Sequence, residues 1–150
     1  MNVQELIDKF RDIAEADSNI GSFSFDDLPS VNIDRQKLYP LILLKTPQSV
    51  MTPFKKTTNE PIYENYTIVF YCLKTWNTVD KTTVSLEQRY KECETIASTY
   101  LRNFLIDTDN VYALYGDKSV SKARGHHQHV DQLVGVSYTF NLRVWNPLCS

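Results

Sequence analysis

The chain has few glycines, few cysteines and no long apolar run, and each shortage excludes a class of protein. Its four glycines form neither a phosphate-binding GxxxxGK[ST] or GxGxxG pattern nor a GxSxG nucleophile turn. Its three cysteines, Cys72, Cys93 and Cys149, are never spaced as CxxC, which argues against a disulfide framework and a structural zinc site. Neither a membrane-spanning stretch nor the apolar core of a signal peptide occurs. We therefore expect a soluble protein made in a reducing cytoplasm.

The charge balance excludes a strong overall attraction to nucleic acid. Sixteen basic side chains face eighteen acidic ones, a formal net charge of −2, so any contact with DNA has to be local. Apolar residues make up 42% of the chain and aromatic residues 12%, which is typical of a folded protein. At 150 residues, the chain is predicted to form one domain over 1–150.

Two segments show the three- and four-residue apolar spacing of amphipathic helices, at residues 3–16 and 85–105. Ser85 and Gln88 are placed as a capping box at the start of the second helix. Cys93 falls on the apolar stripe of that helix, so we expect a buried, unreactive thiol there.

Short apolar or alternating runs between and after these helices predict strands. They lie at residues 38–44, 66–73, 111–115 and 134–144. Residues 119–124 are compatible with a further strand. Because several strands follow one another without an intervening helix, we expect an α+β fold with two helices on one face of an antiparallel sheet of four to five strands. Residues 45–61 and 116–131 would form two protruding loops.

All three histidines lie in the segment GHHQHVD, residues 125–131. On an extended backbone, alternate residues share a face, so His127, His129 and Asp131 form a candidate metal site. However, the chain has neither an HExxH motif nor an H-x-E motif followed by CxxC. We therefore expect a polar loop or hairpin tip, with no metal, no cofactor, no catalytic residue and no enzymatic activity.

Five segments in order carry a resemblance that covers nearly the whole chain. They are residues 3–16, YPLILLKTP at 39–47, ENYTIVFYCLKTW at 64–76, the helix at 85–105 and LVGVSYTFNLRVWNP at 133–147. In order, length and pattern, the chain resembles the tail-terminator and head-to-tail connector proteins of tailed bacteriophages. Its content of Tyr, Asn and Lys is similar to that of phages of gut Bacteroidetes, including crAss-like phages.

The resemblance implies a virion protein of the neck or tail, made in the cytoplasm of the bacterial host. Such a protein forms a ring of six or twelve copies and contacts other neck, portal or tail proteins and, non-specifically, the packaged DNA. No contact with a membrane is implied. The alternative is a stand-alone α+β binding or metal-dependent domain that uses the cluster from His126 to Asp131.

The charge pattern suits a head-to-tail ring. Residues 12–34 contain six acids and no lysine or arginine, whereas the two predicted loops carry an excess of basic residues. Opposite charges on two surfaces of one subunit favour contact between unlike surfaces. We assign interface roles to Asp26, Asp27, Lys45, Lys55, Lys56, Lys118, Lys122 and Arg124.

Overall fold

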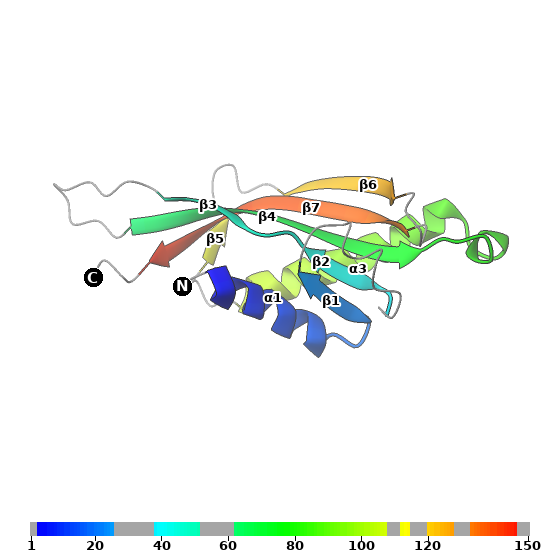
Figure 1. Cartoon of the computed structure of the whole chain (residues 1–150), viewed down its shortest axis with the longest axis horizontal. Coiled ribbons are helices and arrows are strands. Elements are labelled where there is room, and N and C mark those ends of the chain that lie inside the picture. Colours follow the sequence, from blue (N-terminus) through cyan, green and yellow to red (C-terminus); the bar gives the residue numbers. More distant parts are fainter. Residues whose placement is uncertain are drawn as a thin grey trace.

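The computed structural model shows the predicted α+β fold, with two long helices on one face of a sheet (Figure 1). The structure describes residues 3–25, 38–51, 62–107, 112–114, 120–127 and 133–146. The helices are α1 (Val3–Ala16) and α3 (Leu86–Asp107), with a short 3-10 helix, η1 (Asp80–Thr82), before α3. The helices predicted at 3–16 and 85–105 are thus confirmed.

The sheet has seven strands and is larger than predicted. In chain order they are β1 (Ser22–Phe25), β2 (Leu41–Leu44), β3 (Gln48–Met51), β4 (Ile62–Thr75), β5 (Tyr112–Leu114), β6 (Ser121–His127) and β7 (Leu133–Asn146). β4 and β7 form the centre and pair antiparallel over the whole length of both strands. β2 and β3 follow each other along the outer side of β4, and β5 and β6 do the same along β7. The seven strands therefore occupy five side-by-side positions across the sheet, and the sheet has more strands than the four to five that were predicted.

Two strands lie inside the segments 45–61 and 116–131, of which β3 was not predicted and β6 overlaps the further strand that residues 119–124 allowed. β3 occupies 48–51 of the predicted loop 45–61, and β6 occupies 121–127 of the predicted loop 116–131. Between β2 and β3, three residues lie opposite Ile68 and Val69 of β4, and the amide of Lys45 donates to the carbonyl of Val69 at 3.0 Å. An extra residue of this kind is a bulge. Thr46 and Pro47 therefore belong to an interruption between two strands.

β1 was not predicted, and it makes the sheet mixed because it pairs parallel to β2. Its sequence, SFSF, lies in the acidic connector after α1 and is too short to signal a strand by itself. Gly21, just before β1, lies against the backbone of Tyr39, just before β2, and the peptide bond from Tyr39 to Pro40 is cis. The amide of Gly21 donates to the Pro40 carbonyl at 2.8 Å. Pro40 thus precedes β2, as the missing amide proton required.

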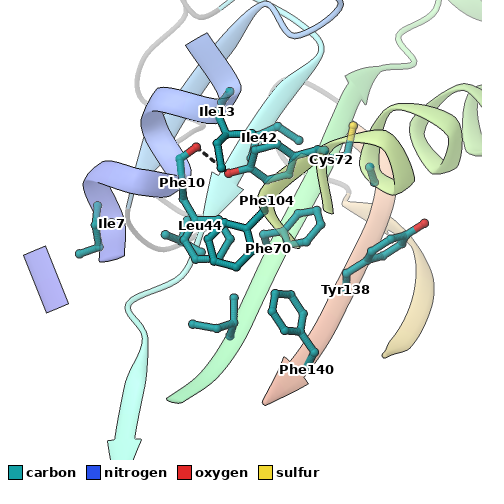
Figure 2. Close-up of a cluster of buried hydrophobic side chains, with 14 of the residues drawn as sticks. Ile7, Phe10, Ile13, Ile42, Leu44, Phe70, Cys72, Phe104, Tyr138 and Phe140 are labelled. Carbon is teal, nitrogen blue, oxygen red and sulfur yellow. Dashed lines mark hydrogen bonds between the residues drawn. The ribbon is translucent and has the colours of Figure 1, made fainter. Parts of the chain in front are cut away.

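The main core lies between the helices and the sheet and is rich in aromatic rings (Figure 2). Phe10 of α1 stacks on Phe104 of α3 with 3.9 Å between the ring centroids. Phe70 of β4 meets the edge of Tyr100 at 5.1 Å, and the Tyr100 hydroxyl donates to the Phe10 carbonyl at 2.8 Å. Burial raises the pKa of Tyr100 well above its usual value. This network holds α1, α3 and β4 in one fixed arrangement.

Both cysteines in the described residues belong to this core. Cys93 of α3 is completely buried, which confirms that it is not an exposed nucleophile. Cys72 of β4 is its neighbour, and the hydrogen bond between the two thiols, together with burial, raises the pKa of Cys72 well above its usual value. Neither thiol is in a disulfide.

The opposite face of the sheet, which we call the open face, has a different composition. It is apolar only at one end, in a small cluster of Leu41, Leu43, Leu73 and Leu133. Farther along, cross-strand partners form polar pairs. The Thr67 hydroxyl donates to the side-chain Oδ1 of Asn141 at 3.1 Å, and the Arg143 guanidinium donates to the side-chain Oδ1 of Asn65 at 3.2 Å. An antiparallel sheet with one covered and one polar face gives the alternation seen in 134–144.

Candidate assembly surface

Strand β6 carries the first two histidines of the predicted cluster. In the register of β6 with β7, His126 pairs with Val134 and His127 with Leu133. His129 and Asp131 lie outside the described residues, and the proposed set of His127, His129 and Asp131 is therefore not tested. Among the residues that the structure describes, no three His, Cys, Asp or Glu side chains come together in a way that could hold a metal ion.

The predicted interface residues are placed only in part. Asp26, Asp27, Lys55, Lys56 and Lys118 lie outside the described residues. The three that remain are on the sheet: Lys45 at the bulge between β2 and β3, and Lys122 and Arg124 on β6. The Lys45 ammonium lies 5.9 Å from the centre of the Tyr71 ring.

Arg124 is engaged with helix α3 of its own chain. Its guanidinium lies 2.7 Å from a Glu94 carboxylate oxygen and 3.1 Å from one of Glu87, and it covers the ring of Tyr90 at 5.2 Å. The hydrogen bond from Arg124 lowers the pKa of Glu94. Within the subunit, Arg124 therefore fastens β6 to α3, and its role at an interface stays a prediction.

A second group of charges lies where β4 meets the start of α3. Glu92 accepts hydrogen bonds from Lys74 at 2.9 Å and from Arg89 at 3.0 Å, and Arg89 also lies 3.3 Å from Asp80. Burial alone would raise the pKa of Glu92, but the hydrogen bonds from Lys74 and Arg89 outweigh it, and the pKa is lowered. Beside this group is an open groove of about 520 Å³. The geometry indicates structural ion pairs that fix α3 on the sheet.

The C-terminal end of α1 forms the described part of the predicted acidic surface. Asp12, Glu15 and Asp17 lie there, and the last turn of the helix contains no basic residue. Asp12 and Glu15 are exposed and form no ion pair within the described part of the chain. Because the C-terminus of a helix carries a partial negative charge, acids at this end destabilise it by a few tenths of a kcal/mol each. A cationic partner would relieve that repulsion.

Across the sheet, α3 and β6 enclose a groove of about 490 Å³ that the sequence did not predict. Leu105 and Ile106 of α3 and Val120 before β6 supply its apolar side chains, and Arg102 and Lys122 supply positive charge. The sequence contained one sign of it, because the apolar stripe assigned to α3 included Leu105. That stripe is wider than the surface the helix buries, since Leu105 is 37% exposed, and Ile106, just beyond the predicted helix, is 65% exposed.

The two edges of the sheet carry these two regions. β1 pairs only with β2 and β6 only with β7 among the described strands, so each has one unpaired side (Figure 1). On the β1 side, Arg11 of α1 lies over the Phe23 ring of β1 and pairs with Asp8, and Glu15 is exposed, while Asp12 and Asp17 line a groove between α1 and α3. The groove with Arg102 and Lys122 belongs to the β6 edge. An unpaired edge strand presents amide and carbonyl groups that can pair with another chain. The molecule thus has two unlike edges, each with its own charge.

Comparison with known proteins adds no family. No model of a protein family matches the chain, and no curated protein sequence matches it. No helix in the described ranges is both long enough and apolar enough to cross a membrane. The function has to be argued from the two edges and the two faces of the sheet.

Proposed function

We propose that this protein is a structural component of a tailed-bacteriophage particle, which assembles into a ring at the neck as a tail terminator or head-to-tail connector. The observation that carries the proposal is the pair of unlike sheet edges, acidic at β1 and basic at β6. A subunit with two different, complementary surfaces joins head to tail, and such contacts close into a ring when the rotation between neighbours allows it.

The direction of the strands supports the same mode of assembly. β1 runs parallel to β2, β2 and β7 both run antiparallel to β4, and β6 runs antiparallel to β7. β1 and β6 therefore run in opposite directions within one subunit. When copies stand side by side in the same orientation, β1 of one copy lies antiparallel to β6 of the next. Antiparallel pairing is the slightly more stable arrangement.

The open face is the surface that we place toward the DNA channel. By register, the described strand residues on this face include Arg143 and no acid, and Lys45, at the bulge, lies over the ring of Tyr71 on the same face. The acids of α1 and α3 lie on the helical side. A neutral to weakly basic wall fits non-specific contact with the DNA phosphates and repels them less than the helical side would. Other neck, portal or tail proteins would bind above and below the ring.

The deciding experiment is to determine the assembly state of the purified protein. We expect native mass spectrometry to show a single closed species of six or twelve copies, and negative-stain electron microscopy to show an annulus. Purified particles of the source phage should contain the protein in that number of copies. A protein that stays monomeric up to the highest soluble concentration would contradict the proposal.

A second measurement separates this proposal from a metal-dependent domain built on residues 126–131. We expect that adding zinc leaves the melting temperature unchanged, because a metal bound only by the folded state would raise it. One zinc bound per chain, with a higher melting temperature, would favour the metal-dependent alternative.

A further inference from the structure

The helical layer covers the sheet unevenly. α1 lies against β1 and β2, and α3 lies against β4 and β7. Over β6, next to α3, the described chain contributes no further helix. The groove lined by Leu101, Leu105, Ile106 and Val120 occupies this position, at the end of the layer opposite α1. If another copy stood beside β6, its own α1 would continue the helical layer over this gap.

Exposed large apolar side chains occur at both ends of the layer. At the β6 end, Leu105 is 37% exposed and Ile106 65%. At the other end, Phe25 of β1 is 36% exposed, and Leu38, which lies beside Ser22 of β1, is 67% exposed. Scattered exposed apolar residues are normal on a protein surface. Here, however, four of the five such residues in the described part of the chain lie beside the two unpaired strand edges.

The facing of Phe25 agrees with insertion into the groove. Phe25 pairs with Leu44, whose side chain is in the core under the helices, so Phe25 is on the helical side of β1. Lys122 pairs with Tyr138, a residue of the same core, so the groove is on the helical side of β6. When β1 of one copy continues the sheet beside β6 of the next, Phe25 lies on the same side as the groove.

The charges at the two ends are also complementary. Arg102 and Lys122 are exposed at the groove and form no ion pair with any described residue. At the β1 end, Glu15 is exposed at the end of α1 and is likewise without an ion pair in the described part of the chain, whereas Asp12 faces the groove between α1 and α3. Opposite potentials on two surfaces favour their association and disfavour contact of each surface with itself.

We infer that the α3/β6 groove of one copy receives the β1 edge of a second copy of this chain, with Phe25 entering between Ile106 and Val120. In this contact, Glu15 of one copy approaches Arg102 and Lys122 of the other, and β1 pairs antiparallel with β6. The inference rests on the proposed function and specifies the contact that would repeat around the ring.

Charge exchange tests the contact. Arg102→Glu with Lys122→Glu should raise the protein concentration at half-assembly at least tenfold, measured by analytical ultracentrifugation. Adding Glu15→Lys to the same chain should restore part of the assembly, because every interface then carries the exchanged charges. Lys81→Glu with Lys91→Glu makes the same change in net charge on exposed residues away from the groove and should leave assembly unchanged. The melting temperature of each variant shows whether it is folded.

Cysteine cross-linking gives an independent result. In a Cys149→Ser background, Phe25→Cys or Ile106→Cys alone should yield no covalent dimer under mild oxidation. The two together in one chain should yield a ladder of cross-linked species that ends at the ring. This pattern distinguishes a head-to-tail contact from a two-fold one, in which a single cysteine meets its own copy.

The outcomes separate the two proposals. Rings that form normally in the charge-reversed variant, or a double-cysteine variant that gives no ladder although rings are present, would overturn this contact and leave the proposed function standing. A wild-type protein that remains monomeric would overturn both. Dimers from either single cysteine would replace the contact with a two-fold one.

Discussion

The two faces of the sheet are made by the same strands, yet they differ in how they are stabilised. On the covered face, Phe70 and Tyr138 contact side chains of α3 and are completely or almost completely buried. On the open face, Thr67 and Asn141 are exposed and hydrogen-bond only across the sheet. The difference shows that the sheet depends on the helices for its stability, while its open face is free to serve contacts with other molecules.

The largest effect should come from the covered face. Phe70→Ala removes the ring that contacts Tyr100, Tyr138 and Phe140, and we expect unfolding to become easier by about 3 to 5 kcal/mol. Chemical denaturation measures this value. The control is Val69→Ala, the neighbouring residue in β4 on the open face, which should cost less than about 1 kcal/mol. Similar losses for the two variants would contradict the contrast between the faces.

One position on the open face, Gly135, should be an exception and should not tolerate a larger side chain. A Cβ atom on Gly135 would lie 2.0 Å from the Cys72 carbonyl oxygen, so the two central strands cannot accept a side chain there without moving. We expect Gly135→Ala to destabilise the fold by about 1 to 3 kcal/mol. Ser137→Ala, two residues along β7 on the same face, should have little effect. A fully stable Gly135→Ala protein would show that the strands separate easily at this point.

The ion pairs at the rim of the covered face should have a smaller, pH-dependent effect. The folded pKa of Glu92 is lowered, so its contribution is present above its ordinary pKa and is lost as the pH falls through the lower folded value. Glu92→Gln should therefore cost up to about 1 kcal/mol at neutral pH, and the cost should shrink as the pH falls through the lowered folded pKa of Glu92. Denaturation midpoints from pH 7 to pH 3 measure the difference. A constant difference across this range would show that Glu92 acts by packing.

The polar pairs of the open face should have the smallest effect. Thr67→Val removes the hydrogen bond to Asn141 at an exposed position and replaces it with a residue that is equally suited to a strand. We expect a change of less than about 0.5 kcal/mol in either direction. A loss greater than 1.5 kcal/mol would mean that the polar pairs hold the sheet together and that the two faces are less different than they look.

The sequence allowed the strongly periodic elements to be predicted, and it failed where a short strand depends on its neighbours. The helix at 3–16 and the last strand were found because their apolar residues follow one period throughout. β1 and β3 have four residues each, and they exist because β2 and β4 offer them a partner. A strand that owes its position to pairing across distant residues leaves little local signal.

The same reason limits what could be predicted about the assembly surface. The acidic segment and Lys122 were assigned to an interface because charge can be read directly from the sequence, and that assignment stays a prediction. Arg102 and Ile106 were not predicted, because they line a groove only where the sheet extends beyond α3 to β6. That arrangement depends on the width of the sheet. Arg124 was assigned to an interface, although in the subunit its charge is matched by Glu87 and Glu94.

The order of the central strands has a consequence for synthesis. β7 lies inside the sheet but comes after every other described strand in the chain. Its pairing with β4 joins residues far apart in the sequence, such as Ile62 and Asn146. Contacts between residues so far apart slow folding. A nascent chain therefore cannot present a finished β6 edge until β7 has left the ribosome, and in the proposed ring this would keep incomplete polypeptides from capping a growing annulus.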